Sequence, residues 1–242
     1  MAQQRRRKNR AKIKAAYLKR GDMYNRRREF TKAKAAFLKV LAIDADDADA
    51  HHNIGITYMA LEAPETAVSH FKKALALNPK MSEVYYKLGY VYVELKRFED
   101  AMEMGTAALA ADRDEEKEKA HYVLGRAYIG LDAYEKALHH FQQARELGLD
   151  TIELDFYIGN TYAFLGEYDL ALEHLQQSLT QNPEIPMVHN SIALVYMRQG
   201  RFEEAEEYIT DALLLDSSCE ATYEVLELFE QEQKAQKQEE NT

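Results

Sequence analysis

The chain has 242 residues, of which 46% are hydrophobic, with only 10 Gly and 4 Pro. This composition, rich in helix formers and poor in turn residues, predicts an all-α protein. A single cysteine, Cys219, excludes an intramolecular disulfide, a four-cysteine metal site and a CxxC redox motif. No uninterrupted run of about 18 apolar residues occurs, and the basic start lacks the apolar segment of a signal peptide, so we expect a cytoplasmic protein.

Charge is divided unevenly along the chain, which has a net charge of −10. Residues 1–40 carry 15 Lys and Arg against Asp22 and Glu29, a net charge of +13 that leaves −23 for residues 41–242. Residues 201–242 alone carry 13 Asp and Glu against 3 basic residues. The two ends of the chain therefore have opposite charge.

We expect residues 1–13 to form a basic N-terminal arm. The basic residues of the arm include Arg5, Arg6, Arg7, Lys8 and Arg10. Arg26, Arg27 and Arg28 follow in a short polar segment that we expect to connect two helices. Such a cluster favours a polyanionic partner: an anionic membrane surface, the acidic end of another copy of the chain, or nucleic acid. Nucleic acid is the least favoured, because only Tyr17 and Tyr24 offer stacking and the rest of the chain is acidic. The alternative is a solvated, partly disordered arm without a partner.

From residue 14 onwards one pattern occurs six times. A small residue followed three positions later by Tyr recurs at intervals of 34, 34, 36, 34 and 34 residues, in the pairs Gly21/Tyr24, Gly55/Tyr58, Gly89/Tyr92, Gly125/Tyr128, Gly159/Tyr162 and Ala193/Tyr196. Twelve residues after each small residue stands an alanine: Ala33, Ala67, Ala101, Ala137, Ala171 or Ala205. A large apolar residue follows four positions later in five of the six copies: Phe37, Phe71, Phe141, Leu175 or Ile209.

This pattern resembles the tetratricopeptide repeat family, in which L-G-x2-Y is followed by A-x3-F and then by P. The resemblance implies a right-handed α-solenoid of about six helix-turn-helix repeats, at residues 14–47, 48–81, 82–117, 118–151, 152–185 and 186–219. A capping helix at residues 220–237 and a disordered tail at 238–242 would follow. The small residues would allow the two helices of each repeat to cross closely, with Tyr and Phe filling the space around the crossing.

The third repeat departs from the pattern. Gly105 stands where the other repeats have a large apolar residue, and two extra residues fall within residues 112–118. Glycine in a packed helix face lowers helix propensity by roughly 1 kcal/mol, which predicts a weak joint between the third and fourth repeats. A locally closer approach of two helices is an equally good interpretation.

No sequence motif indicates catalysis, a cofactor or a bound metal. The hydrolase, zinc-protease and nucleotide-binding signatures are absent. The pairs His51-His52 and His139-His140 are adjacent on predicted helices, so the two side chains of each pair point about 100° apart and do not converge on one ion. We therefore expect a protein that is not an enzyme.

The resemblance also implies that the first helices of the repeats line a concave groove for a partner protein. Residues three before and one after each small residue lie on one helix face. With their neighbours they give the expected groove residues: His52, Asn53, Ile56, Tyr86, Lys87, Tyr90, Tyr122, Arg126, Phe156, Tyr157, Asn160 and Asn190. This mixture favours a peptide or helix with apolar anchors. Packing between first helices is the alternative role of Tyr86, Tyr122 and Phe156.

One subset of the family holds the carboxylate of chaperone tails with Lys and Asn side chains. Asn53 and Lys87 match two of those positions, but Leu18, Asp22 and Glu83 occupy others, which disfavours this ligand. The sequence thus predicts a protein-binding scaffold or adaptor that binds a peptide or helix and can self-assemble through its oppositely charged ends. A regulatory protein that uses its basic arm on nucleic acid or a membrane surface is the alternative function.

Overall fold

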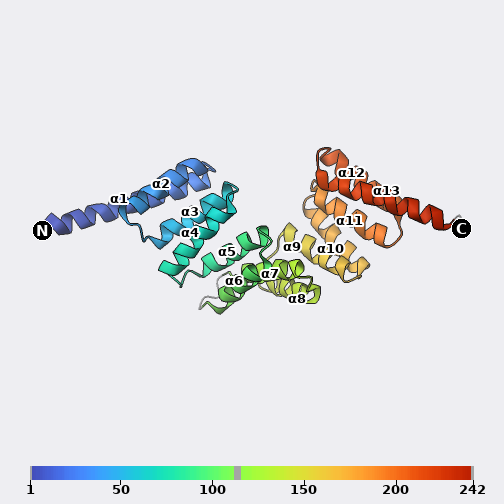
Figure 1. The fold of residues 1–242 in the computed structure, drawn as a ribbon, viewed down its shortest axis with the longest axis horizontal. Coiled ribbons are helices and arrows are strands. Elements are labelled where there is room, and N and C mark those ends of the chain that lie inside the picture. Colours follow the sequence, from blue (N-terminus) through green and yellow to red (C-terminus); the bar gives the residue numbers. More distant parts are fainter. Residues whose placement is uncertain (1, 112–115, 241–242) are drawn as a thin grey trace. The chain divides into compact units, whose positions relative to one another are not determined.

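The computed structural model describes residues 2–111 and 116–240, and in them it contains thirteen α-helices and no strand (Figure 1). The chain consists of two compact units, residues 1–131 and 132–242. Unit 1 contains α1 (Ala2–Arg26), α2 (Phe30–Ile43), α3 (Ala48–Ala60), α4 (Pro64–Leu77), α5 (Ser82–Glu94), α6 (Phe98–Ala110) and α7 (Lys117–Gly130). Unit 2 contains α8 (Tyr134–Glu146), α9 (Ile152–Phe164), α10 (Tyr168–Gln181), α11 (Pro186–Arg198), α12 (Phe202–Leu215) and α13 (Glu220–Glu240). The predicted all-α repeat fold is confirmed.

Close crossings between paired helices explain the recurring small residue. A Cβ atom added to Gly55 in α3 would lie 2.5 Å from Cε1 of Phe71 in α4, and the ring of Phe71 is fully buried. A Cβ atom added to Gly159 in α9 would lie 2.7 Å from Cγ of Leu175 in α10. Because a side chain at either glycine would overlap its partner, glycine is required at these crossings.

The turn inside a helix pair is closed by main-chain atoms. The tyrosine of the repeat pattern accepts, through its carbonyl oxygen, a hydrogen bond from the amide five residues later: Glu29 to Tyr24, Ala63 to Tyr58, Arg97 to Tyr92, Glu167 to Tyr162 and Arg201 to Tyr196, at 2.8 to 3.0 Å. The residue before each of these amides has positive φ: Arg28, Glu62, Lys96, Gly166 and Gly200. This arrangement is a Schellman motif, which ends the first helix and sets the direction of the second.

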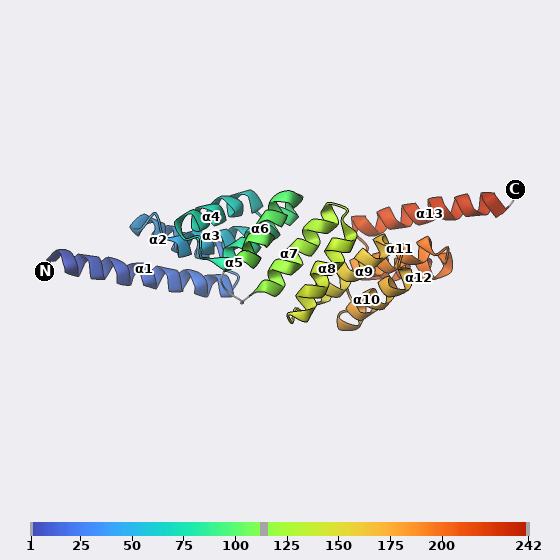
Figure 2. The same cartoon turned by 90° about the horizontal axis from the view of Figure 1, so that it is seen from below.

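Helix α1 includes the residues that we expected to form an arm. It begins at Ala2 and continues to Arg26, and its start projects beyond α2 (Figures 1 and 2). The helix persists because Ala, Gln, Lys and Arg are strong helix formers and no proline interrupts them. Lys14 binds Asp44 and Asp47 at 2.7 Å each, and Arg10 donates to the carbonyl oxygen of Ile43 at 3.0 Å. In the structure residues 2–13 form the first part of this helix, and the role of this basic segment stays a prediction.

Helix α13 covers the end of unit 2. Thr222, Val225 and Phe229 are buried, and Val225 and Phe229 belong to the same apolar cluster as Ile192 of α11 and Ile209 of α12. The helix continues to Glu240, so residues 238–240 of the expected disordered tail are helical, because Gln and Glu favour a helix. Residues 241–242 lie outside the described part of the chain.

The third repeat contains a close contact. A Cβ atom added to Gly105 in α6 would lie 2.7 Å from Cγ of Leu124 in α7. This geometry agrees with the second interpretation, in which glycine allows two helices to approach closely. Residues 112–115, within the predicted insertion, lie outside the described residues. The boundary between the two compact units in the sequence follows Leu131. It falls inside the fourth predicted repeat and not between the third and the fourth. A weak joint between the third and fourth repeats stays the alternative prediction.

Candidate protein-binding face

The expected groove residues fall on the first helices of the repeats in each unit. In unit 1 they are His52, Asn53 and Ile56 of α3, Tyr86, Lys87 and Tyr90 of α5, and Tyr122 and Arg126 of α7. We call these eight residues the unit 1 face. In unit 2 they are Phe156, Tyr157 and Asn160 of α9 and Asn190 of α11. Because the structure has two units, the two sets are separate candidates.

Tyr86 and Lys87 form the centre of a polar network on the unit 1 face. Nζ of Lys87 lies 2.7 Å from Oε1 of Glu83 and donates to the hydroxyl of Tyr86 at 2.9 Å. The same ammonium lies 4.9 Å from the centre of the Tyr86 ring. Burial opposes ionisation of Glu83, but the hydrogen bond and charge of Lys87 outweigh it and lower the pKa of that carboxyl. Lys87 is therefore paired with protein groups already.

The network continues to the start of α7. The hydroxyl of Tyr86 donates to Oε1 of Glu116 at 3.3 Å, and Nζ of Lys119 donates to the same oxygen at 2.9 Å. Burial, and then the charge of Glu116, raise the pKa of the Tyr86 hydroxyl, so it remains protonated and acts as a donor. The Tyr86 side chain is thus fixed between α5 and α7.

Arg126 is held between two tyrosine rings. Its guanidinium carbon lies 4.9 Å from the ring centre of Tyr90 and 5.8 Å from that of Tyr122. Its Nη2 donates to Oε1 of Glu94 at 2.7 Å. The side chain of Arg126 is 11% exposed, whereas that of Glu94 is 50% exposed. Cation–π contacts and one ion pair therefore hold both rings at the partly exposed surface.

The α3 residues contribute less exposed surface than we expected. His52 is only 8% exposed, and its Nε2 lies 3.8 Å from Oε1 of Glu83. Burial lowers the pKa of His52. Ile56 packs against the core of α4 and α5, and Asn53 is half-buried. His52 is therefore mainly a packing residue, which corrects its expected role as a groove residue.

Charge on the unit 1 face and the residues bound to it is balanced. Three cations, Lys87, Lys119 and Arg126, are matched by the carboxylates of Glu83, Glu94 and Glu116. A partner with a strong net charge gains little from such a surface, whereas one that covers the three tyrosine rings can bury apolar area. Because Lys87 is already bound to Glu83 and Tyr86, a terminal carboxylate would have to displace existing bonds.

In unit 2, the residues on α9 form an aromatic cluster. The ring of Tyr157 stacks on Phe141 of α8 at 5.9 Å, and Phe156 meets Tyr157 edge to face at 5.3 Å. The amide of Asn160 donates to the carbonyl oxygen of Phe156 at 3.0 Å. Phe164, at the end of the same helix, is 61% exposed and stacks on Tyr134. Phe156, Tyr157 and Asn160 are half-buried.

Asn190 does not lie on an open surface. It is 5% exposed, and its Nδ2 donates to the hydroxyl of Thr222 in α13 at 3.0 Å. The expectation that Asn190 contacts a partner is wrong, because α13 packs against α11 and covers this position. The Oδ1 atom of Asn190 is buried and has no hydrogen-bond partner among the described protein atoms.

Sequence reasoning missed a set of polar bridges inside the helix pairs. Asp155, which is 4% exposed, binds His174 at 3.0 Å and also pairs with Arg145. Nδ1 of His51 lies 3.0 Å from Nδ1 of His70, and the rings of His189 and Tyr208 are 5.8 Å apart. Asp155 and His174, His51 and His70, and His189 and Tyr208 are each 19 residues apart, whereas Arg145 lies on the preceding helix, α8. Polar residues at this spacing in three repeats are the signal that could have revealed the bridges.

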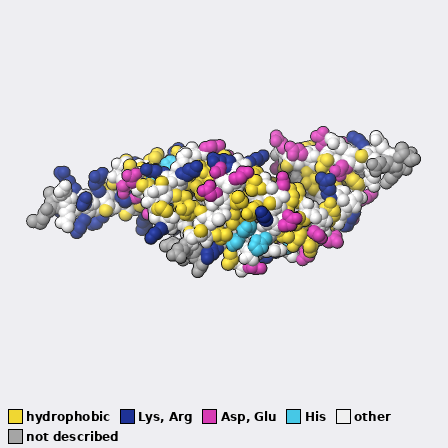
Figure 3. Space-filling view, turned by 60° about the horizontal axis from the view of Figure 1, so that its bottom comes forward, with side chains coloured by type: hydrophobic (Ala, Val, Ile, Leu, Met, Phe, Trp, Pro, Cys, Tyr) yellow, Lys and Arg dark blue, Asp and Glu magenta, His cyan; other side chains and the backbone are white. Residues whose placement is uncertain are grey.

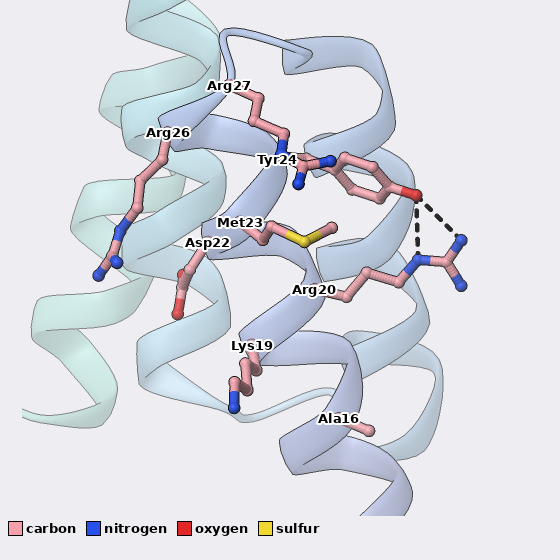
Figure 4. A pocket seen from close by; sticks show the side chains of 8 residues that line it. All are labelled: Ala16, Lys19, Arg20, Asp22, Met23, Tyr24, Arg26 and Arg27. Carbon is pink, nitrogen blue, oxygen red and sulfur yellow. Dashed lines mark hydrogen bonds between the residues drawn. The ribbon is translucent and has the colours of Figure 1, made fainter.

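A separate hollow lies on α1, with a volume of about 780 Å³, lined by Ala16, Lys19, Arg20, Asp22, Met23, Tyr24, Arg26 and Arg27. Figure 4 shows Arg20 and Tyr24 on one side of the helix, and Lys19, Asp22 and Arg26 on the other. The remaining basic residues, Arg5, Arg6, Arg7, Lys8, Arg10 and Arg28, are exposed. Figure 3 shows Lys and Arg side chains along the projecting start of α1. Binding of this end to a membrane or to nucleic acid stays a prediction.

Three family models match the sequence, and all three are described as tetratricopeptide repeats. They cover residues 58–118, residues 158–218, and, for the third model, residues 15–47 and 118–147. The chain belongs to the tetratricopeptide repeat family. This is a family of non-catalytic repeat scaffolds that commonly bind proteins. No curated protein matches the sequence.

Solved structures of tetratricopeptide repeat proteins have the same fold. A chain of the APC/C hetero-tetramer Cut9-Hcn1 superposes with a TM-score of 0.79 at 21% identity, over 89% of the present chain and 42% of that chain. This chain therefore spans less than half of that protein. PilF of Pseudomonas aeruginosa superposes with a TM-score of 0.74 at 20% identity, over 89% of this chain and 97% of PilF. YrrB, described as a repeat protein with an unusual peptide-binding site, superposes with a TM-score of 0.58 at 25% identity, over 79% of this chain and 98% of YrrB.

The described residues include neither a membrane-spanning helix nor a candidate metal cluster. None of their helices has the length and hydropathy that a bilayer crossing requires. Likewise, they contain no cluster of three or more His, Cys, Asp or Glu side chains that could hold a metal ion.

Proposed function

We propose that this tetratricopeptide repeat protein is a scaffold or adaptor that binds a helix or extended segment of a partner protein on the unit 1 face. The observation that carries the proposal is the row of three half-buried tyrosines, Tyr86, Tyr90 and Tyr122, which Lys87 and Arg126 hold in place. Rings that are already ordered lose little conformational entropy when a partner covers them. Tyrosine and arginine are also the residues most often responsible for binding energy at protein interfaces.

The chemistry of the face favours a partner segment with apolar anchors and little net charge. Charged groups on the face neutralise each other, so burial of ring surface supplies the main gain. Asn53 of α3, half-buried beside the network, is available to bind a partner's backbone amide or carbonyl. A segment ending in a free carboxylate would approach the acidic side chains of Glu83 and Asp22.

Comparison with known structures supports a peptide-binding role in general terms. YrrB is described as having a peptide-binding site, and Cut9 is found in a complex with Hcn1. These descriptions concern those proteins. The aromatic cluster of Phe156 and Tyr157 on α9 is a second candidate surface of the same kind in unit 2.

Selection from a random peptide library on the intact protein tests the proposal, followed by affinity measurements with fluorescent peptides. The variant Tyr86→Ala/Tyr122→Ala should weaken binding at least tenfold, about 1.4 kcal/mol. The variant Tyr86→Phe/Tyr122→Phe retains the rings and should bind within about threefold of the natural chain.

The control Glu99→Ala/Glu103→Ala changes two exposed residues of α6, a second helix, and should leave affinity unchanged. Amidation of the peptide C-terminus should also have no effect. Peptides that bind the alanine variant as tightly as the natural chain would refute the proposal. Loss of binding on amidation would show instead that the face recognises a terminal carboxylate.

A further inference from the structure

The outward face of α1 is a continuous stripe of exposed residues. Ile13, Ala16, Arg20 and Met23 follow one another at intervals of three or four, Arg27 comes directly after the helix, and all five are exposed. Residues with this spacing lie on one side of a helix. In a stack of repeats, this is the side on which a preceding repeat would pack.

The stripe borders two hollows with apolar and aromatic surfaces and cationic edges. The hollow of about 780 Å³ on α1 includes Ala16 and Met23. A second hollow, of about 340 Å³ between α1 and α2, is lined by Tyr17, Arg20, Tyr24, Lys32, Ala35, Ala36 and Lys39. Together their linings contain six cations and one carboxylate, that of Asp22. We call the residues that line both hollows the cationic end face.

Several of these cations are ordered by tyrosine. Nε and Nη2 of Arg20 donate to the hydroxyl of Tyr24 at 3.1 and 2.9 Å. Nζ of Lys39 lies 5.2 Å from the centre of the Tyr17 ring, and Nζ of Lys32 lies 5.8 Å from that of Tyr24. Cations held over aromatic rings form a fixed rim, which suits a ligand whose carboxylates flank an apolar or aromatic side chain.

The outer side of α13 has that complementary composition. Thr222, Val225 and Phe229 face the core of unit 2. The opposite side exposes Tyr223, at 51%, together with Glu224, Glu227 and Glu230. Residues 201–242 have a net charge of −10. We call Tyr223, Glu224, Glu227 and Glu230 the acidic end face.

We propose that the acidic end face of one copy docks on the cationic end face of a second copy. The charges are opposite, and each face presents aromatic surface between its charged groups.

Association of two unlike faces leaves one of each free, so it does not stop at two copies unless a ring closes. The contact would weaken with added salt, because the exposed charges on both faces would be screened. The Debye length, over which charges interact, is about 30 Å in 0.01 M salt and about 3 Å in 1 M salt. This proposal does not depend on the unit 1 face, and either can fail without the other.

Sedimentation velocity of the intact chain tests the contact. At low salt we expect species larger than the 27.9 kDa monomer that grow with protein concentration, and at high salt we expect the monomer. The variant Arg20→Glu/Arg27→Glu should be monomeric, as should Glu224→Lys/Glu227→Lys. An equimolar mixture of the two variants should associate again, because the first variant keeps its acidic end face and the second keeps its cationic end face.

The control Glu206→Lys/Glu207→Lys changes the net charge of α12 by the same amount as Glu224→Lys/Glu227→Lys changes that of α13. Glu206 and Glu207 are both exposed. It should retain assembly, and circular dichroism should show all variants folded. A natural chain that is monomeric at every salt and concentration would overturn the proposal. So would a failure of the mixed variants to assemble, or monomers of the control. Anionic vesicles or RNA that bind the cationic end face of such a monomer would identify a different occupant.

Discussion

Nη2 of Arg126 in α7 lies 2.7 Å from Oε1 of Glu94 in α5, and the two side chains are 32 residues apart in the sequence. This pair joins neighbouring first helices, and Tyr90 and Tyr122 enclose the guanidinium. The contact therefore stabilises the packing of α5 against α7 and also holds the rings of Tyr90 and Tyr122 on the unit 1 face.

The two partners of this pair should contribute unequally to stability. Arg126→Ala removes contacts to two rings as well as the charge, and we expect it to lower the free energy of unfolding by about 1 to 2 kcal/mol. Glu94→Gln leaves Arg126 on its rings and removes only a half-exposed charge, so the loss should be below about 1 kcal/mol. Urea unfolding of both variants measures the difference. Equal losses would show that the ion pair, and not the rings, holds Arg126.

Substitution of Gly55 should test the close crossing of α3 and α4. We expect Gly55→Ala to destabilise the chain by about 1 to 3 kcal/mol, because the new methyl group would overlap the Phe71 ring. The sixth repeat pairs Ala193 with Ile209, both buried. Phe71→Ile in the Gly55→Ala background should therefore recover part of the loss in thermal unfolding. No recovery would mean that the backbones, and not the ring, forbid the methyl group.

The buried Asn190 should depend on α13. Thr222→Val removes its hydrogen-bond partner and leaves a buried amide unsatisfied, which should cost about 1 to 3 kcal/mol. Asn190→Leu/Thr222→Val replaces both polar groups and should be closer to the natural chain than Thr222→Val alone. Peptide affinity at the unit 1 face should not change in either variant. A larger loss in the double variant than in the single one would contradict this reading of the contact.

Stability should fall as the pH decreases from about 7 to 5. Burial, and then the proximity of His51, lower the pKa of His70, and burial lowers that of His52. The unfolded chain, with histidine pKa values of about 6.5, therefore binds more protons than the folded chain in this range. Carboxylates with lowered pKa values, such as Glu204, lose their contribution only at lower pH.

The urea midpoint at several pH values measures this dependence. His70→Gln should reduce the slope between pH 7 and 5, while the same change at the exposed His139 should not. A steeper slope for His70→Gln would contradict the direction of the pKa change.

Hydrogen exchange should show whether Gly105 lies in a tight contact or in a weak joint. Since a Cβ atom at Gly105 would meet Leu124, we expect amides at residues 104–110 to be as well protected as those at 172–178. Markedly faster exchange at 104–110 would support the joint.

The fold was predictable because local sequence and packing agree at each repeat. Gly55 and Phe71 are 16 residues apart, and both helix-packing logic and the family pattern place them at one crossing. Asn190 was misplaced because the capping helix was expected, but its contact with Asn190 through Thr222 was not. His52 has the same difficulty: its position on the helix face was clear, but its exposure depends on Glu83 and Phe71 of neighbouring helices.

The Schellman turns have a practical consequence, because their hydrogen bonds use main-chain atoms and tolerate different side chains. Arg28, Glu62, Lys96, Gly166 and Gly200 all occupy the same backbone conformation and are exposed. These turns are therefore suitable places for attaching fluorescent reporters. A donor at Glu62 and an acceptor at Lys96 would follow movements within unit 1 without altering either of the proposed binding surfaces.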